Sequence, residues 1–284
     1  MNNIAVLMTC HNRVSETLAC LEALYISAKN IIVNINVFLV DDGSKDNTYE
    51  KVSATFPKIN IIRGSGNLFW NQGMRLAWST ACKNAEYDFY LLLNNDTFLN
   101  SDGLKIIFDN YFGYKTEFKK EAIVVGACSE STECNVLSYG LRMMNNDIIY
   151  PNENFKCGDL MNGNCVLISR KIFKSIGLLS ENYTHAMGDI DYGLRAIEAG
   201  FYLITTTKFV ATCESHNSLP VWCNSKKSFK QRWQSLHSPL GLNINEYKIF
   251  RKRFWPEVYI ISILKIYFRC LFPSIYTKII NSEI

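Results

Sequence analysis

Four polar segments in the first hundred residues each follow an apolar run, and they contain the side chains best suited to bind a charged ligand. They read Thr9-Cys10-His11-Asn12-Arg13, Asp41-Asp42-Gly43-Ser44, Gly64-Ser65-Gly66-Asn67 and Asn94-Asn95-Asp96. One such segment is ordinary turn chemistry. Four of them predict a binding crevice, because ligands of open parallel sheets bind beyond the carboxyl ends of the strands.

The acidic residues of these segments suit two kinds of contact. Asp41 and Asp42 are adjacent after one apolar run, and Asp96 follows another. Such carboxylates accept hydrogen bonds from a base or ribose, and they ligate hard divalent cations, which commonly take one or two carboxylates plus substrate phosphates. A turn with a helix N-cap would explain one of the first two residues without a ligand, and an Asx-turn would explain the third.

Two familiar nucleotide-binding motifs do not fit the sequence. The segment GSGNLF (64–69) keeps two glycines of the Gly-x-Gly-x-x-Gly pattern, but Phe69 stands where the third belongs. The segment also follows the third apolar run rather than the first, and there is no P-loop pattern. A classical dinucleotide site is therefore disfavoured.

The elements that must position these segments alternate between two types. Short apolar runs predict strands, and apolar residues at helical spacing predict helices. The predicted strands are 4–8, 33–40, 59–64, 88–93, 122–129, 164–169 and 201–210, and the predicted helices are 13–27, 47–56, 71–85 and 189–200. This alternation indicates an α/β fold with a mostly parallel sheet, and the lack of strict polar alternation fits strands covered on both faces.

The composition fits a folded protein with an unusual C-terminal segment. Of the 284 residues 48% are hydrophobic, which is enough for a full core, and the net charge of +4 is too small to indicate nucleic acid as a partner. Residues 221–284 contain 11 Lys and Arg against 3 Asp and Glu, whereas residues 1–220 contain 19 against 23. We expect one compact domain over 1–220 and a basic, aromatic extension over 221–284 that meets an anionic partner.

The cysteines and the N-terminus indicate a cytoplasmic protein. Ten cysteines stand at irregular spacings without a Cys-x-x-Cys motif, which favours scattered thiols in a reducing compartment over a disulfide framework or a zinc site. The N-terminal sequence MNNIAVLMTCHNR has no basic region and only a short apolar run, so it predicts a first strand rather than a signal peptide.

Six segments occur in an informative order: MTCHNR, FLVDDGSKDNT, GNLFWNQGMRLAW, YLLLNNDTFL, MNGNCVLISRKIFKSIGLLSENY and MGDIDYGLRAIEAG. In this order and approximate spacing the chain resembles glycosyltransferase family 2, and most of all its bacterial rhamnosyltransferase-like branch, over about residues 4–216. The resemblance implies a GT-A fold, in which a Rossmann-like nucleotide-binding half is fused to an acceptor-binding half.

The resemblance also implies a donor site. The family's Asp-Asp after the second strand, here Asp41 and Asp42, would hold the nucleoside. The family's Asp-x-Asp element falls on Asn94-Asn95-Asp96, so Asp96 would bind a Mn²⁺ or Mg²⁺ ion that bridges the donor diphosphate, and Asn94 replaces the first acid. The other residues expected at the nucleotide-sugar are Thr9, Asn12, Arg13, Asn67, Asn71, Gly73, Asn94 and Asn95, with Trp70 facing the sugar or nucleotide.

The implied catalytic element is an acidic pair at the start of a helix, commonly Glu-Asp-x-Asp. It falls on Gly188-Asp189-Ile190-Asp191, without the leading glutamate. Asp189 would take the proton from an acceptor hydroxyl. Asp191 is the alternative base, or it caps the helix or pairs with Arg195 four residues later. His216 matches a position where related enzymes carry a histidine near the metal, although a lone histidine is otherwise an ordinary surface or core residue.

The C-terminal segment 245–280 is apolar, aromatic and basic. Its longest clean apolar run, 258–264, is shorter than the roughly 20 residues that a membrane-spanning helix needs. The pattern favours a helix that lies in the interface of an anionic leaflet. A core-capping helix or a homodimer contact would give the same pattern.

The combined expectation is an inverting, metal-dependent glycosyltransferase that is cytoplasmic and peripheral on the inner face of the cell membrane. It would move a sugar, with L-rhamnose as the first candidate, from a nucleotide-diphosphate donor to a saccharide or lipid-linked saccharide in surface polysaccharide or O-antigen synthesis. Two alternatives stay open. A sugar nucleotidyltransferase is one, although TCHNRVSE is a poor triphosphate loop. A non-catalytic membrane-associated scaffold is the other, which Asn94 and the missing glutamate favour.

Overall fold

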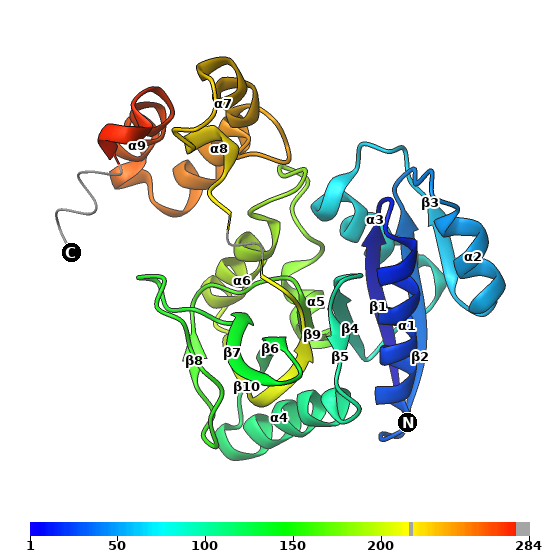
Figure 1. The fold of residues 1–284 in the computed structure, drawn as a ribbon. Coiled ribbons are helices and arrows are strands. Elements are labelled where there is room, and N and C mark those ends of the chain that lie inside the picture. Colours follow the sequence, from blue (N-terminus) through cyan, green and yellow to red (C-terminus); the bar gives the residue numbers. More distant parts are fainter. Residues whose placement is uncertain (216–217, 277–284) are drawn as a thin grey trace. The chain divides into compact units, whose positions relative to one another are not determined.

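A computed structural model describes residues 1–215 and 218–276 of the chain. Within these residues ten strands form one sheet (Figure 1), in the order β3-β2-β1-β4-β9-β6-β10-β5, with β7 paired to β6 and β8 paired to β10. The strands are β1 (Asn2–Cys10), β2 (Val33–Asp41), β3 (Asn60–Arg63), β4 (Phe89–Leu93), β5 (Phe98–Leu99), β6 (Ala122–Ser131), β7 (Cys134–Tyr139), β8 (Cys157–Gly158), β9 (Cys165–Ser169) and β10 (Tyr202–Thr212).

The strand directions confirm the expected mostly parallel sheet. Strands β3, β2, β1 and β4 are parallel to their neighbours in that order. Strand β9 runs antiparallel between β4 and β6, and β10 is parallel to β6, so β1, β2, β3, β4, β6 and β10 all run in one direction. The carboxyl ends of β1, β2 and β4 therefore lie at the same edge, where the sequence places its polar segments.

Helices cover both faces of the sheet, as Figure 1 shows. One face packs against α1 (Val14–Ala28), α2 (Thr48–Thr55) and α4 (Gly103–Phe118), and the other against α3 (Phe69–Asn84), α5 (Arg170–Ile176) and α6 (Gly188–Glu198). Successive residues of β1 enter opposite cores, with Ile4 on the first side and Ala5 on the second. Because both faces are buried, the strand is apolar without alternation.

The sequence predicts the first three helices and four strands within a few residues of their observed bounds. It does not predict α4, α5, β5, β7 or β8, all of which lie between or beside the predicted elements. The α/β GT-A architecture is therefore confirmed, with additions in its second half.

The chain divides into two compact units. The N-terminal unit consists of Met1–Glu181 and Gly188–Ser215 and contains the sheet, whereas the C-terminal unit consists of Asn182–Met187 and His216–Ile284. The C-terminal unit contains the 3₁₀ turns η1 (Val221–Cys223) and η2 (Pro256–Val258) and the helices α7 (Phe229–Leu236), α8 (Ile244–Phe254) and α9 (Tyr259–Leu271). These helices confirm the expected helical extension, and the domain boundary expected near residue 220 stays a prediction.

The C-terminal unit has a small core of its own, formed by Trp222, Cys223, Leu236, Ile244 and Cys270. The buried guanidinium of Arg232, on α7, donates from Nε to the carbonyl of Cys270 at 2.8 Å. The last carbonyls of a helix lack helical donors, so this bond both caps α9 and holds it to α7.

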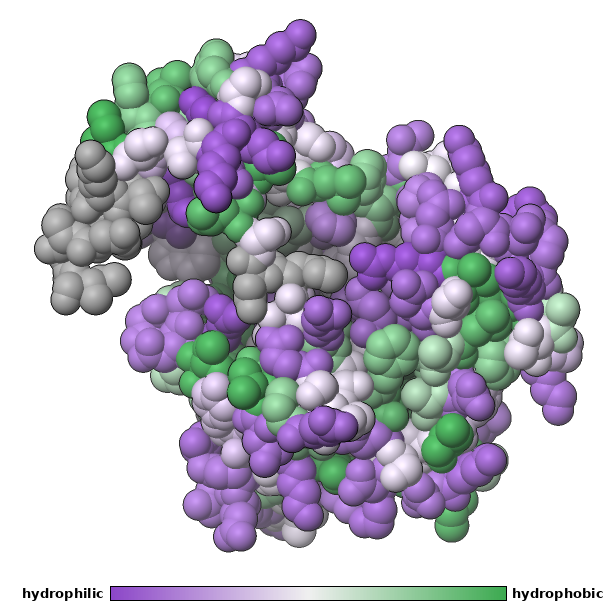
Figure 2. Space-filling view, in the orientation of Figure 1, coloured by the Kyte–Doolittle hydropathy of each residue, from purple (hydrophilic) through white to green (hydrophobic). Residues whose placement is uncertain are grey.

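The opposite face of α9 and of the residues just after it is apolar and exposed. Its exposed side chains are Ile260, Ile261, Leu264, Phe268, Leu271, Phe272 and Ile275. On the side of the molecule drawn in Figure 2, hydrophobic residues gather over part of the C-terminal helices beside hydrophilic ones. None of the helices within residues 1–215 and 218–276 has both the length and the apolar character needed to cross a bilayer.

Candidate active site

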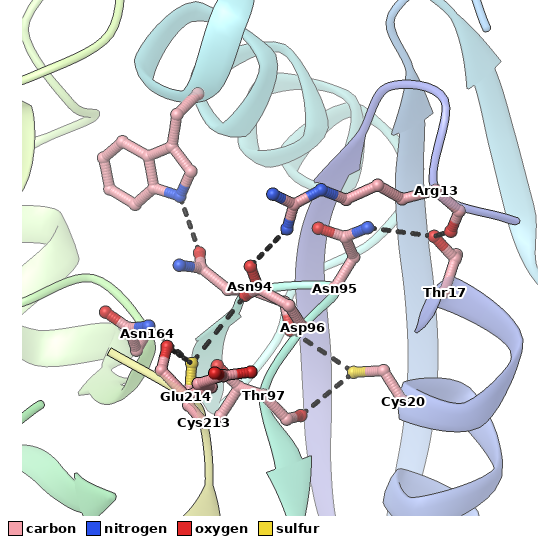
Figure 3. Close-up of polar contacts among 11 residues, drawn as sticks. Arg13, Thr17, Cys20, Asn94, Asn95, Asp96, Thr97, Asn164, Cys213 and Glu214 are labelled. Carbon is pink, nitrogen blue, oxygen red and sulfur yellow. Dashed lines mark hydrogen bonds and ion pairs between the residues drawn. The ribbon is translucent and has the colours of Figure 1, made fainter. Parts of the chain in front are cut away.

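Asp96, just beyond β4, is paired with Arg13, just beyond β1 (Figure 3). Arg13 donates from Nη1 to Asp96 Oδ2, and the two side chains are 42% and 27% exposed. The pair forms where the adjacent strands β1 and β4 end. The predicted metal ligand and a predicted nucleotide-binding residue are thus in contact, and the exposed guanidinium, a fork of N–H donors, offers a binding surface to an anion.

The two asparagines before Asp96 are held by their neighbours. Asn94 Oδ1 accepts a hydrogen bond from Trp70 Nε1 at 2.7 Å. Asn95 is buried and donates from Nδ2 to Thr17 Oγ1, on α1, at 3.0 Å. These bonds fix the loop after β4, so Asp96 projects from a rigid support.

Asp42 organises the loop that precedes α3. Its buried carboxylate accepts hydrogen bonds from the backbone N–H groups of Gly66, Leu68 and Phe69 at 2.7–2.9 Å. Two of these donors belong to the start of α3, where backbone N–H groups lack helical acceptors. Asp42 therefore has a structural role, and Asn67 is exposed in the loop that it holds. Contact of either residue with a nucleoside stays a prediction.

Asp41 and Asn12 hold the loop after β2. Asp41 is buried and accepts from the backbone N–H of Ser44 at 3.0 Å. Asn12 accepts from the backbone N–H of Lys45 at 2.7 Å, and its own N–H donates to Ser44 Oγ at 2.9 Å. The ends of β1 and β2 are therefore one connected surface.

Two residues of α3 position the site through packing. A Cβ atom at Gly73 would stand 2.3 Å from Thr9 Oγ1, so the absence of a side chain lets α3 approach the end of β1. Asn71 is buried and donates to the carbonyl of Ser180 at 2.8 Å. A Cβ atom at Gly188 would stand 1.8 Å from Asn71 Oδ1, so Asn71 fits against the first residue of α6.

Asp189 lies in the first turn of α6, partly buried. Its carboxylate accepts hydrogen bonds from the backbone N–H of Gly163 and from that of Ile190, each at 2.9 Å. Burial raises the pKa of the Asp189 carboxyl above its ordinary value, whereas these two N–H groups act in the opposite direction. A carboxylate whose pKa is raised toward the working pH is a better proton acceptor in a transition state.

Asp191 has a different environment, although it lies only two residues away. It is 2% exposed and accepts from Arg195 Nε at 2.6 Å. The same guanidinium donates to the carbonyls of Ile176 and Leu178 at 2.8 and 3.0 Å. The pairing expected at i+4 is therefore present, and it ties α6 to the end of α5.

A single indole connects the two halves of the candidate site. Trp70 donates to Asn94, and a Cβ atom at Gly163 would stand 2.2 Å from Trp70 Cζ2, so the ring lies on the Gly163 backbone. The N–H of Gly163 in turn binds Asp189. Asn94 and Asp189 are thus connected through two intermediates within the N-terminal unit.

The groups around Asp96 limit how a divalent cation could be held. In the part of the chain that the structure describes, no group of three His, Cys, Asp or Glu side chains could hold an ion. One carboxylate, Asp96, fits a Mn²⁺ or Mg²⁺ ion bound mainly through substrate phosphates and water, rather than an all-protein cage. His216, the second predicted ligand, lies outside the described residues.

Sequence reasoning missed two contacts of the site. Gly163 lies in the motif MNGNCV, but the sequence cannot show that its N–H binds Asp189. Cys213, just after β10, lies beside Asp96 (Figure 3), and its Sγ is 4.0 Å from Asp96 Oδ1. Burial and the Asp96 charge raise the pKa of this thiol to about 11, so it is neutral at pH 7.

Comparisons with known proteins show the fold and the family of the chain. No curated protein sequence matches the chain. Among solved structures the chain is similar to a mannosyltransferase, PcManGT from Pyrobaculum calidifontis in complex with GDP-Man and Mn²⁺, with a TM-score of 0.53 and 11% identity over 93% of this chain and 73% of that one. At this identity the likeness shows the fold.

The family follows from a sequence model. The model of glycosyl transferase family 2 matches residues 5–177, which include the strand-end segments, Trp70 and Gly163. The rhamnosyltransferase-like branch stays a prediction. Because the matched residues make up more than half of the chain, the protein belongs to glycosyl transferase family 2.

Proposed function

We propose that this glycosyltransferase is inverting and that Asp189 is its catalytic base. The observation that carries the proposal is the environment of the Asp189 carboxylate, which is oriented by Gly163 and Ile190, raised in pKa by burial, and connected through Trp70 to the Asn94–Asp96 segment. As the acceptor hydroxyl attacks the anomeric carbon, Asp189 takes its proton. Attack from the face opposite the departing nucleoside diphosphate inverts the anomeric configuration.

The donor is a nucleotide-diphosphate sugar bound across the ends of β1, β2 and β4. The exposed Arg13 guanidinium is suited to the diphosphate, because it presents several N–H donors in a plane. Asp41, Asp42, Asn12 and Asn67 stand on the loops where the nucleoside would lie. The sugar identity follows only from the resemblance, which favours L-rhamnose, and from the similar mannosyltransferase, which favours testing GDP-mannose as well.

A divalent cation, Mn²⁺ or Mg²⁺, would be held by Asp96 together with the donor diphosphate. When bound, it supplies positive charge that stabilises the leaving group. Arg13 must then exchange its partner, because the guanidinium occupies Asp96 Oδ2. The negative oxygens of the diphosphate offer Arg13 a new partner when the donor arrives.

The acceptor is a saccharide or lipid-linked saccharide at an anionic membrane surface, in surface polysaccharide synthesis. The exposed apolar face of α9 supports this proposal, because the exposed Lys265 and the half-buried Arg269 stand on the same helix. Exposed apolar side chains beside cationic ones are typical of helices that lie in a membrane interface.

The donor half of the proposal is tested by nucleotide-sugar hydrolysis. The purified full chain with Mn²⁺ is incubated with dTDP-L-rhamnose, GDP-mannose, UDP-glucose and UDP-galactose, and the release of nucleoside diphosphate is measured. We expect slow release from one of them, lost in Asp96→Ala and kept in Asp109→Ala, an exposed aspartate on α4 that pairs with Lys105. A folded chain that neither binds nor hydrolyses any donor would support the scaffold alternative.

The membrane half is tested by flotation with vesicles. We expect binding to vesicles of phosphatidylcholine with phosphatidylglycerol and weaker binding to phosphatidylcholine alone. The double substitution Ile261→Glu and Leu264→Glu should abolish binding, whereas Ile32→Glu, at an 84% exposed position of the N-terminal unit, should not. Equal binding of both variants would contradict the role of α9.

A further inference from the structure

A second concave surface lies in the N-terminal unit, outside the residues of the candidate active site. It is a groove of about 710 Å³, within the size range of small-molecule sites. Residues that line it include Asn100, Thr132, Asn135, Tyr150, Lys208 and Phe209. Asp96 and Asp189 do not line it, and the donor-binding segments do not contribute to it.

The wall of the groove is a β-bulge in β10. The register of β10 against β6 shifts between Thr205 and Phe209. At the bulge Thr206 replaces the missing ladder contacts, since its Oγ1 accepts from the backbone N–H of Ala127 at 3.0 Å and donates to the carbonyl of Lys208 at 2.8 Å. Bulges re-aim side chains and are frequent beside binding sites.

Two asparagines make this wall rigid. Asn110, on α4, accepts from the backbone N–H of Thr207 at 2.7 Å and donates to Thr207 Oγ1 at 3.1 Å. Asn100 donates to the carbonyl of Phe209 at 3.1 Å. The bulge is therefore held by side chains from two other segments, so the groove is pre-formed, and ligand binding needs little ordering.

The chemistry of the lining favours a neutral polyhydroxyl ligand. The charged residues among the described lining are Asp102 and Lys208, whose charges cancel. The rest is mostly hydroxyl and amide groups with two aromatic rings, Tyr150 and Phe209. A sugar ring has hydroxyl groups at its rim and apolar C–H groups on its faces, which match amide and hydroxyl partners and aromatic rings respectively. A phosphate-rich ligand would need a cluster of cations.

Several polar groups of the groove are available to a ligand. Within the described residues the side chains of Thr132, Asn135, Tyr150 and Lys208 make no hydrogen bond to the protein. Tyr150 is 46% exposed, so its ring as well as its hydroxyl can contact a bound molecule. These groups are solvated in the free protein, and a ligand that replaces water must supply equivalent hydrogen bonds.

The groove is close in the chain to the candidate active site. Its residue Thr212 precedes Cys213, whose Sγ lies 4.0 Å from Asp96 Oδ1. A chain of sugars that is longer than the reacting unit could therefore contact both regions of the N-terminal unit.

We propose that this groove binds saccharide units of the acceptor that lie beyond the reacting unit. That the bound saccharide belongs to the acceptor rests on the proposed function, whereas the existence of a saccharide site rests on the groove alone. It implies that the enzyme extends an existing oligosaccharide and distinguishes it from a single sugar.

The test uses the full chain on a printed array of bacterial oligosaccharides that range from single sugars to hexasaccharides. We expect binding of a neutral oligosaccharide, about tenfold weaker after Tyr150→Ala and weaker after Asn135→Ala, because the ring and amide contacts are lost. The matched control is Phe112→Ala, since Phe112 is 44% exposed and does not line the groove. Asp96→Ala should bind the same oligosaccharide as the unaltered chain. Melting temperatures of all variants identify any that fail to fold.

Three outcomes overturn the saccharide site: no binding to any array member, binding unaffected by both groove substitutions, or binding lost in Asp96→Ala. Donor hydrolysis is measured on the same proteins and should be unchanged in Tyr150→Ala. If the unaltered chain hydrolyses a donor but binds no saccharide, the saccharide site in the groove is refuted but the proposed function is not. Saccharide binding without hydrolysis of any donor would refute the proposed function but leave the groove as a saccharide site.

Discussion

The donor-side loops and the start of α6 use their polar side chains differently. At the ends of β1, β2 and β4 most of them hold the structure: Asp42 binds three backbone N–H groups, and Asn95 binds α1. At the start of α6 Asp189 is held by two backbone N–H groups, and burial raises its pKa. Acidic residues of similar appearance in the sequence thus hold loops on one side, whereas on the other side Asp189 has the environment that we propose for a catalytic base.

The difference is sharpest between Asp189 and Asp191, which share one helical turn. Asp191 is paired with a guanidinium that also binds two carbonyls, whereas Asp189 accepts hydrogen bonds from the backbone N–H groups of Gly163 and Ile190. Through these bonds the Asp191–Arg195 pair ties α6 to the end of α5. The ion pair gives Asp191 a structural role, and the catalytic role is the one that we propose for Asp189. Substitutions at the two positions test this difference.

The largest effect is expected for Asp189→Asn. The amide keeps the shape of the side chain but cannot accept a proton, so sugar transfer should fall by about 10²–10⁴-fold. Donor affinity, measured by calorimetry, should change little, because Asp189 is assigned to the acceptor hydroxyl. Transfer at an unaltered rate would show that another group is the base.

Asp191→Asn should act on stability instead. Removing one partner of a buried ion pair leaves Arg195 uncompensated, and such changes cost about 3–5 kcal/mol of unfolding free energy. Urea denaturation measures the loss. The control Arg170→Gln alters a pair that is more exposed, with side chains 32% and 38% exposed, and should cost less. A stable Asp191→Asn protein that has lost sugar transfer would indicate that Asp191, rather than Asp189, is the base.

Asp42→Ala is expected to have an intermediate effect. It leaves the N–H groups of Gly66, Leu68 and Phe69 without their acceptor, and an unsatisfied buried group costs about 1–3 kcal/mol. The loop before α3 should then exchange its amide hydrogens faster, which hydrogen exchange with mass spectrometry detects. Unchanged exchange in residues 64–70 would mean that the loop does not depend on Asp42.

The smallest effect is expected for Arg13→Ala. It should change the concentrations of Mn²⁺ and of donor that give the half-maximal rate in opposite directions. Asp96 loses a competitor, so the Mn²⁺ concentration for half-maximal donor hydrolysis should fall by up to about fivefold, since an exposed ion pair contributes at most ~1 kcal/mol. The donor concentration for half-maximal rate should rise, because a diphosphate contact is lost. Arg13→Lys keeps the charge, so both concentrations should lie between those of the unaltered chain and those of Arg13→Ala. Equal shifts in the same direction would contradict the partner exchange.

The helices and strands of the first half of the fold could be predicted from the sequence, because hydrophobic periodicity encodes them. Strands β1 to β4 and helices α1 to α3 were predicted from apolar runs and helical spacing. Helix α4 carries the same signal, with Leu104, Ile107, Phe108 and Tyr111 all buried, although it is not among the predicted helices. Strands β5 and β8 have two residues each, and no periodicity can be read from so short a segment.

Only part of the candidate active site could be predicted from the sequence. The positions of Asp96 and Asp189 followed from strand ends and from the resemblance, but their partners are separated in sequence. Arg13 lies 83 residues from Asp96, and Gly163 lies 26 residues from Asp189. Such contacts depend on strand order and on close packing at glycines, which one sequence does not reveal. For the same reason Gly73 and Asn71, predicted as donor-binding, have packing contacts that the sequence could not show.

The pH dependence of sugar transfer tests the role of Asp189 most directly. The base acts as a carboxylate, so transfer must fall as the pH drops through the pKa of Asp189. Because burial raises that pKa above the ordinary value of 3.8, we predict a loss of rate that begins at higher pH than for an ordinary aspartate, while tryptophan fluorescence shows the protein still folded. In Asp189→Asn the residual rate should lack this dependence. A rate in the unaltered enzyme that stays constant down to the pH of unfolding, or the same acid limb in Asp189→Asn, would contradict the account.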